Sequence, residues 1–419
     1  MNDTPEVSAI KDESVGEALT ARCCIAGGGP AGMMLGYLLA RAGVAVIVLE
    51  KHADFFRDFR GDTIHPSTLE VVYELGLLDD FLKRPHQELR ELRGWIGDQM
   101  VPVADFSRLP TRCKFIALMP QWDFLDFLAH HGRKHPNFRL RMQAEVIDLI
   151  EAGGRVAGVR ARTPGGTLEV RADLTIGADG RHSTVRSKAG LDVIDLGAPM
   201  DVLWLRLSQR PDDPKQSLGR FEPGHVFVMI DRGDYWQCAF VIPKGGIDEV
   251  KRRGLDAFRA EVANVAPVLR DRVGEITAWD DVKLLTVAVD RLREWYRPGL
   301  LCIGDAAHAM SPIGGIGINL AVQDAVAAAN ILAAPLRRGS AALDDLRAVQ
   351  RRREFPTKLT QRGQVLIQNC VIRPVLAAAG KPFSMPLVLR LLRDWPFLRR
   401  IPARIIGMGV QPEHVKASP

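Results

Sequence analysis

The beginning of the chain switches between strand-like and helix-like spacing of apolar positions. Residues 22–26 form a short apolar run, and residues 33–42 repeat apolar side chains at helical spacing up to Gly43. Residues 44–49 are apolar and rich in β-branched side chains, which is typical of a buried parallel strand. Together these segments predict a βαβ unit.

Shorter segments of alternating polarity follow. Residues 138–178 alternate, with turn signals at 153–154 and 164–166, and end in an apolar strand, which predicts an antiparallel meander. Further strands are predicted at 202–207, 225–230, 235–242, near 282–289 and at 299–303, with a turn at 231–234.

Other periodic segments predict helices. Ser67-Thr-Leu-Glu70 has the sequence of a capping box and predicts the start of a short helix that Gly76 ends. An amphipathic helix begins at Gln121, and an apolar helix covers residues 318–332. The chain after it is predicted to be helical with proline breaks.

These elements predict an α/β (α+β) protein. It has a Rossmann-like domain with a parallel sheet and a β-meander, then an antiparallel-sheet domain that holds the substrate, and C-terminal helices. Part of residues 85–115 could belong to the antiparallel domain. The predicted boundaries are a flexible tail at 1–19, a discontinuous first domain at 20–195 and 284–335, the antiparallel domain at 196–283, and the helical region at 336–419.

Composition narrows the class of protein. Hydrophobic residues are 47% and charged residues 25% of the 419, as in ordinary globular proteins. No uninterrupted apolar run approaches the ~18 residues of a membrane span, and the N-terminus lacks the apolar core of a signal peptide. The six cysteines have no metal-binding or redox spacing, so we expect buried thiols, no metal, and a reducing cytoplasm.

Charge is distributed unevenly along the chain. Residues 331–419 carry 16 Lys/Arg and 5 Asp/Glu, a net charge of +11, within a total of +6. This segment is either the solvated face of C-terminal helices or a peripheral membrane or lipid contact. Nucleic acid is not expected as a partner, because no binding motif is present. The oligomeric state cannot be inferred.

Three glycine-bearing motifs follow strand ends. Gly27-x-Gly29-x-x-Gly32 links the strand and helix of the βαβ unit, and Glu50 ends its second strand. Glycines at these positions allow a tight turn and close approach of a pyrophosphate, and the acid can accept ribose hydroxyls. The motif predicts a dinucleotide site. The other two motifs are Gly177-Ala-Asp179-Gly180, followed by Arg186, and Gly304-Asp305, followed by residues 312–319.

With these motifs in this order, the chain resembles the single-component flavoprotein aromatic hydroxylases, relatives of 4-hydroxybenzoate hydroxylase and of the ubiquinone-biosynthesis hydroxylases. The resemblance covers residues 22–332 and implies FAD as the dinucleotide. It implies that Arg60 contacts the flavin, Gln121 and Asp305 approach the ribityl chain, and residues 312–319 lie against the isoalloxazine ring. The FAD-binding residues implied are Gly27, Gly29, Pro30, Ala31, Gly32, Glu50, Lys51, Arg60, Gln121, Val146, Asp179, Gly180, Arg186, Gly304, Asp305, Pro312, Gly314, Gly315, Gly317, Ile318 and Asn319.

The resemblance also implies a reaction. NADPH or NADH, bound transiently near the Asp179–Gly180 motif, reduces FAD, and O₂ then forms a flavin C4a-hydroperoxide that hydroxylates an aromatic or phenolic substrate. No side chain is assigned a certain catalytic role, because the flavin carries the chemistry. Alternatives are an FAD-dependent reductase or dehydrogenase of a lipid or polycyclic substrate, a flavin-dependent halogenase, although its usual Trp-x-Trp-x-Ile-Pro motif is missing, and a flavin-binding structural or sensing protein.

The substrate is expected between the flavin and the antiparallel sheet. Arg206 could anchor an acidic substrate or be a charge on the sheet surface, and His308 is expected to be a buried structural histidine. The candidate substrate residues are Pro312, His65, Trp204, Arg206, Phe227, Met229, Gln237 and Ala239, of which strand alternation lets about half face the pocket.

Overall fold

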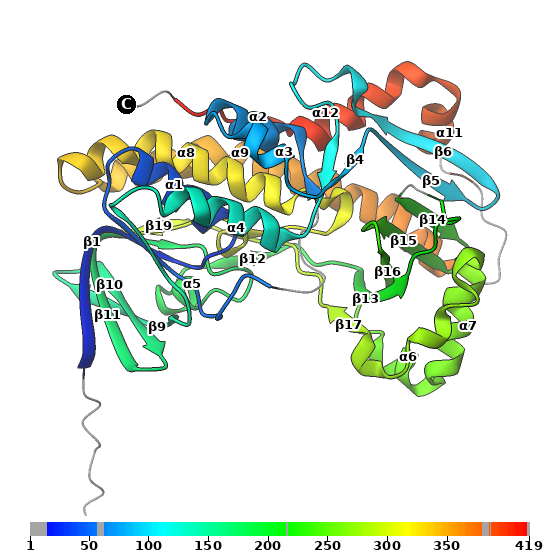
Figure 1. Ribbon diagram of the computed structural model, residues 1–419, viewed down its shortest axis with the longest axis horizontal. Helices are drawn as coiled ribbons and strands as arrows, with labels where there is room; N and C mark the ends of the chain where they lie inside the picture. Colours follow the sequence, from blue (N-terminus) through cyan, green and yellow to red (C-terminus); the bar gives the residue numbers. More distant parts are fainter. Residues whose placement is uncertain (1–14, 57–62, 215–216, 379–384, 386, 417–419) are drawn as a thin grey trace, which may run out of the picture.

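The computed structural model describes residues 15–56, 63–214, 217–378, 385 and 387–416. This part of the chain forms two large sheets that lie beside one another, with long helices across the first and C-terminal helices beside the second (Figure 1). The predicted α/β (α+β) class is therefore confirmed.

The first sheet is built around the predicted βαβ unit. Its strand order is β19-β20-β11-β1-β2-β8, and all of these strands except β19 run parallel. Two further strands, β9 and β10, add the meander next to β11. The bounds are β1 (Val15–Ala26), α1 (Pro30–Arg41), β2 (Val46–Leu49), β8 (Phe138–Arg141), β9 (Glu145–Ala152), β10 (Arg155–Thr163), β11 (Gly166–Gly177), β19 (Tyr296–Arg297) and β20 (Leu300–Cys302).

Two predictions for this sheet are wrong. Strand β1 begins at Val15, because its first half pairs with β11, so residues 15–19 are not a tail. Residues 138–141 form β8, which pairs in parallel with β2 instead of joining the meander. Residues 1–14 lie outside the described residues.

The second sheet is mainly antiparallel, with the order β17-β13-β16-β15-β14-β5-β6. A parallel pair, β14 with β5, brings residues 91–105 into it. One face packs on α7, and the predicted turn at 231–234 joins β15 to β16. The bounds are β5 (Glu91–Ile96), β6 (Gln99–Asp105), β13 (Met200–Ser208), β14 (Leu218–Glu222), β15 (His225–Asp231), β16 (Tyr235–Pro243), β17 (Lys283–Leu285), α6 (Ile247–Arg253) and α7 (Leu255–Val265).

Two three-stranded sheets and short helices connect these units. One small sheet has the order β3-β7-β4 and the other β12-β18-β21. The bounds are β3 (Thr63–Ile64), β4 (Gln87–Leu89), β7 (Ile116–Leu118), β12 (Val193–Asp195), β18 (Asp290–Leu292), β21 (His308–Ala309), α2 (Pro66–Glu74), α3 (Leu78–Leu82), α4 (Gln121–Gly132) and α5 (Thr184–Lys188).

The capping box predicted for α2 is wrong. The helix begins at Pro66, and neither Ser67 nor Glu70 caps it. The Ser67 hydroxyl donates to the Asn319 side chain, and the Glu70 carboxylate accepts from the Arg112 backbone. Both side chains that the local pattern assigned to a helix cap therefore form tertiary hydrogen bonds instead.

From Gly317 onward the described part of the chain is mainly helical. Among the described residues one segment, Ile313–Arg338, is long and apolar enough to cross a membrane, but 78% of its apolar window is buried inside the fold, as in a core helix. Five cysteines are buried as expected, and Cys370 is exposed. The helices are α8 (Gly317–Arg338), α9 (Leu343–Ile367), α10 (Arg373–Ala377), α11 (Leu387–Asp394) and α12 (Arg400–Met408).

Candidate active site

The glycine loop between β1 and α1 combines close packing with open space. A Cβ added at Gly27, where φ is +107°, would lie 2.3 Å from the Ala178 carbonyl oxygen. One at Gly32 would lie 2.0 Å from the Gly27 oxygen. A Cβ at Gly29 would have no atom within 4 Å. The loop therefore requires two glycines for its own packing and presents the third, beside the helix N-terminus, to a ligand.

Packing brings all three motifs together. The Ala178 carbonyl belongs to the second motif and touches the first at Gly27. A Cβ at Gly304, in the third motif, would lie 3.0 Å from the Ala31 Cβ of α1. The carboxyl ends of β1, β11 and β20 thus meet at one edge of the parallel sheet, which is where open α/β sheets bind ligands.

Glu50 anchors the first turn of the loop. Its buried carboxylate accepts from the Gly28 backbone through Oε2 and from the His52 backbone through Oε1, each at 3.0 Å. An acid at this position fits an adenosine ribose, and the open space at Gly29 fits a pyrophosphate. The residues present therefore fit a dinucleotide such as FAD.

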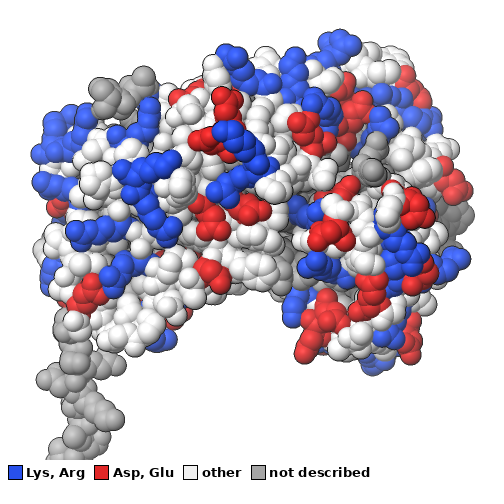
Figure 2. Space-filling view, in the orientation of Figure 1, with Lys and Arg blue, Asp and Glu red and all other residues white. Residues whose placement is uncertain are grey.

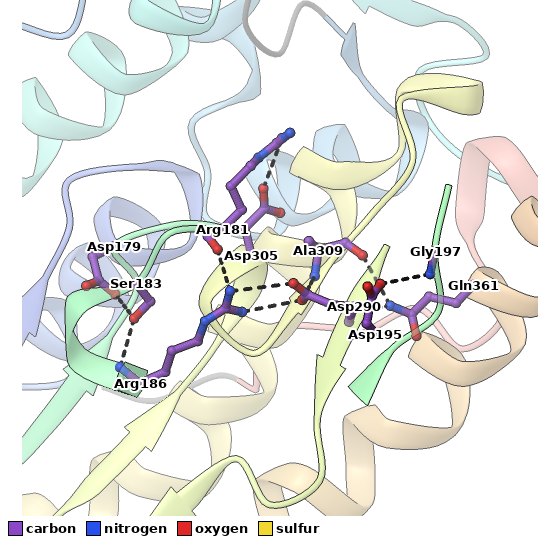
Figure 3. A network of polar contacts seen from close by, with 10 residues as sticks. All are labelled: Asp179, Arg181, Ser183, Arg186, Asp195, Gly197, Asp290, Asp305, Ala309 and Gln361. Carbon is purple, nitrogen blue, oxygen red and sulfur yellow. Dashed lines mark hydrogen bonds and ion pairs between the residues drawn. The ribbon is translucent and has the colours of Figure 1, made fainter. Parts of the chain in front are cut away.

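The second motif is built around Asp179. This carboxylate accepts from the Ser183 hydroxyl and, at 3.0 Å, from the Val185 backbone at the start of α5 (Figure 3). Burial raises the pKa of Asp179, and these hydrogen bonds oppose that rise. Arg186 forms an ion pair with Asp290 at 3.3 Å. A contact of this motif with the nicotinamide donor stays a prediction.

The third motif begins with Gly304 and Asp305. Asp305 lies 3.5 Å from Arg181, so an arginine of the second motif faces the predicted ribityl-binding carboxylate (Figure 3). Both side chains are partly exposed, and solvent or a ligand hydroxyl can compete for either. The pair links the second motif to the third.

The predicted flavin loop has a glycine-dependent backbone. Gly314 and Gly315 have φ values of +79° and +63°, which favour glycine. A Cβ on Gly315 would lie 2.5 Å from the Thr63 hydroxyl oxygen, and this hydroxyl donates to the Gly315 carbonyl at 2.8 Å. Gly317 begins α8, so the N-terminus of this helix adjoins the loop.

Side chains from distant elements clamp this loop. Asn319, 2% exposed, accepts from the hydroxyls of Ser67 at 2.6 Å and Thr68 at 2.9 Å, both on α2. From α9, Gln364 accepts from the Ser311 backbone and donates to its carbonyl. Sequence analysis missed the α9 contacts. The sequence feature that could have predicted these contacts is a row of polar residues at helical spacing, all of which are buried in the structure: Gln350, Arg353, Thr357, Gln361, Gln364 and Gln368.

A buried charged network behind the third motif was also missed. Asp324 accepts from the Gly304 backbone at 3.0 Å and from Arg353 at 3.0 Å, and it bonds His308 at 2.6 Å. Arg353 also donates a hydrogen bond to the Glu413 carboxylate at 3.3 Å. Burial raises the pKa of Asp324, but His308 and Arg353 more than reverse this, so it lies below its ordinary value. His308 is buried and hydrogen-bonded, as expected.

The remaining predicted cofactor residues lie on the same elements. Pro30 is the first residue of α1, Gln121 is the first residue of α4, and Lys51 is exposed just after β2. Val146 is buried in β9. Arg60 lies outside the described residues.

Residues 20–363 match the family of FAD binding domains. The chain belongs to this family. It is 35% identical to 6-methylpretetramide 4-monooxygenase of Streptomyces rimosus, over 90% of this chain and 91% of that one. It is 28% identical to para-nitrophenol 4-monooxygenase of Pseudomonas sp. (strain WBC-3), over 79% and 82%.

The fold is shared with solved structures. The crystal structure of PqsL, a probable FAD-dependent monooxygenase from Pseudomonas aeruginosa, matches with a TM-score of 0.72 and 22% identity, over 86% of this chain and 98% of that one. The protein is accordingly an FAD-dependent aromatic monooxygenase, an oxidoreductase that uses FAD, NAD(P)H and O₂ on a small aromatic substrate.

One face of the second sheet is turned toward the predicted flavin loop, and contact of this face with the substrate stays a prediction. Trp204, Val228 and Ala239 share an apolar cluster with Ile313 of the flavin loop, so this face is turned toward the loop. Gln237, paired with Arg206 across the strands, is buried and accepts from Arg232 at 3.2 Å.

Two predicted substrate residues are on the wrong face. Phe227 and Met229 are fully buried on the opposite side of the sheet, where they pack with Phe258 of α7. Arg206 is exposed, lies 4.0 Å from Asp234 and stacks on Tyr235 at 3.7 Å from the ring centre. These contacts suit a charge on the sheet surface, and anchoring of an acidic substrate by Arg206 stays a prediction.

His65 lies between the flavin loop and the C-terminal helices. It is fully buried, and its Nδ1 donates to the Ile406 carbonyl of α12 at 2.7 Å. Burial lowers the pKa of His65 to about 4, although the Ile406 and Gly315 carbonyls oppose the shift. Direct contact with the substrate stays a prediction.

The free energy of unfolding is expected to fall by about 2 kcal/mol between pH 7 and pH 5 because of His65. The unfolded chain binds a proton near pH 6.5, whereas the folded chain resists it down to about pH 4, so acid favours unfolding. Urea titrations of wild type and His65→Gln measure this slope. The variant should lack it, exposed His130→Gln is the control, and an unchanged slope in His65→Gln would contradict the assignment.

Proposed function

We propose that this monooxygenase hydroxylates an uncharged polycyclic phenol. The observation that carries this proposal is the apolar sheet face that packs toward the flavin loop, formed by Trp204, Val228 and Ala239 with Ile313. A broad apolar wall suits a fused ring system, whereas an aromatic acid needs a cation. The relative with 35% identity is named for 6-methylpretetramide, which supports the same class.

FAD, when bound, supplies the redox chemistry with NAD(P)H and O₂. Residues of the chain would hold it: Glu50 and the Gly29 backbone would bind the nucleotide end, and Asp305 would accept from the ribityl hydroxyls. The loop at 312–319 presents backbone N–H groups and the start of α8, which favour negative charge on the ring. The apolar sheet face excludes water from the reacting centre.

The test is anaerobic mixing of the purified, FAD-loaded protein with NADPH or NADH and a panel of compounds. The panel contains polycyclic phenols, single-ring phenols and aromatic acids, and the measurement is loss of the blue flavin absorption band. We expect polycyclic phenols to accelerate bleaching by at least about tenfold over the other classes, which corresponds to ~1.4 kcal/mol of activation free energy. Product mass then shows the added oxygen.

Other outcomes discriminate the alternatives. Acceleration by aromatic acids alone would contradict the substrate class and restore a role for a cation such as Arg206. A brominated product in the presence of bromide would indicate a halogenase. Substrate turnover without oxygen uptake would indicate a reductase or dehydrogenase.

A further inference from the structure

The C-terminal helices expose most of the large apolar side chains that are on the surface. Nine such side chains among the described residues are more than half exposed, and eight of them lie in residues 355–405. Single exposed apolar residues are ordinary, but a contiguous group marks an interaction surface. Six belong to α11, α12 and the turn between them, each 52–67% exposed: Leu387, Val388, Trp395, Phe397, Ile401 and Ile405.

These six side chains and Leu391 form one surface, here called the C-terminal patch. Val388 and Leu391 follow helical spacing on α11, and Trp395 continues it just beyond the helix. Ile401 and Ile405 follow the same spacing on α12, and Phe397 precedes them by four residues in the turn between the helices. The rings of Trp395 and Phe397 lie 5.8 Å apart and join the two stripes. The patch is therefore continuous from one helix to the next.

Each of the two helices carries apolar side chains beyond the face that contacts the rest of the protein. Both helices lie against β6, at the edge of the molecule (Figure 1). Against the protein, α11 buries Leu392, and α12 buries Ala403 and Gly407. The exposed stripes lie beyond these contacts. Packing among the described residues thus does not account for the patch.

Positive charge accompanies the patch. Residues 387–408 contain five arginines and one acid, Asp394, which forms an ion pair with Arg393. Arg390, Arg400 and Arg404 are exposed, and the latter two lie one turn apart on α12. Figure 2 shows basic side chains and uncharged surface along the upper edge, with some acidic side chains among them, where α11 and α12 lie in Figure 1.

We propose that the C-terminal patch docks on the surface of an anionic lipid bilayer. Helices that carry large apolar residues beside arginines bind in the plane of a membrane interface, with the apolar face in the lipid and the arginines at the headgroups. A second copy of the chain fits less well, because a two-fold interface centred on α12 would bring Arg400 and Arg404 near their own copies.

Docking would place the lipid one helix away from the substrate side of the active site. The Ile406 carbonyl of α12 accepts from His65, and the Ile406 side chain packs in a cluster with Ile230, on the substrate sheet, and Leu118. An α-helix is about 10 Å across. The docking inference does not depend on the substrate class, since it rests on α11 and α12 alone.

The test is cosedimentation of the FAD-loaded protein with vesicles of equimolar phosphatidylglycerol and phosphatidylcholine, and with phosphatidylcholine alone. We expect at least about tenfold stronger partitioning to the anionic vesicles, weakened by salt. Arg400→Gln with Arg404→Gln should lower the partition coefficient by about 25-fold, since each arginine near the surface contributes about fivefold. Phe397→Ser with Ile401→Ser should lower binding to a similar degree.

Matched controls lie elsewhere on the surface. Arg252→Gln on α6, where the side chain is 74% exposed, and Leu284→Ser on β17, 43% exposed, should bind like wild type. Flavin content and melting temperature verify the fold of every variant. Wild type that stays in solution with anionic vesicles, or patch variants that bind as it does, would overturn the proposal. A dimer that the patch variants convert to monomer would assign the patch to a second copy instead.

Discussion

The Asp324→Asn variant is expected to lose up to about 3–5 kcal/mol of free energy of unfolding, because it removes the buried carboxylate that Arg353 and His308 share and leaves Arg353 with Glu413 as its one carboxylate among the described residues. Arg353 is 1% exposed and Asp324 is 0% exposed, so water cannot replace the lost carboxylate. The same carboxylate holds the Gly304 backbone at the third motif. We therefore also expect weaker FAD binding in the fraction that folds. Urea unfolding at neutral pH, followed by circular dichroism, measures the loss.

The matched control is Asp344→Asn. Its carboxylate pairs with Arg347 on the surface of α9, with the Asp344 side chain 84% exposed, and exposed pairs of this kind contribute about 0.5 kcal/mol or less. Asp324→Asn combined with Arg353→Met removes both buried charges and should recover part of the loss. A loss for Asp324→Asn no larger than for Asp344→Asn would show that the network does not stabilise the fold.

The cofactor side of the fold could be predicted because backbone geometry determines it. Gly27 and Gly32 have contacts that no side chain can enter, and Glu50 ends a strand of the same βαβ unit. Such packing requirements act between nearby residues, and they are visible in the sequence as a fixed spacing of glycines. The order of the three motifs then places them at one sheet edge, where the structure has them.

Features that depend on distant contacts were not predicted. Ser67 and Glu70 match a capping box locally, but in the structure they form hydrogen bonds with the Asn319 side chain and the Arg112 backbone. Alternation in β15 shows that Phe227 and Met229 share a face, but not which face, because that depends on where α7 packs. The glutamines of α9 are polar and helical, so the sequence favoured a solvated face for them. Their partners come from β18, β21 and the flavin loop.

The Gly29→Val variant is expected to separate folding from cofactor binding. Gly29 has extended backbone angles, φ −74° and ψ −176°, that valine adopts without strain, and its Cβ would touch no atom of the protein. The melting temperature of the apoprotein should stay within a few degrees of wild type. The added side chain occupies the space through which a pyrophosphate approaches the backbone, so the Kd for FAD should rise at least about 100-fold, or ~2.7 kcal/mol.

Two other glycine variants serve as controls for this prediction. Gly274→Val, at a site where a Cβ also meets no atom within 4 Å but far along the chain in the substrate domain, should bind FAD like wild type. Gly32→Ala should disturb the loop itself, because its Cβ would lie 2.0 Å from the Gly27 oxygen, and it should lower both stability and FAD affinity. Quenching of FAD fluorescence by the apoproteins gives each Kd. Tight FAD binding by Gly29→Val would mean that the pyrophosphate lies elsewhere.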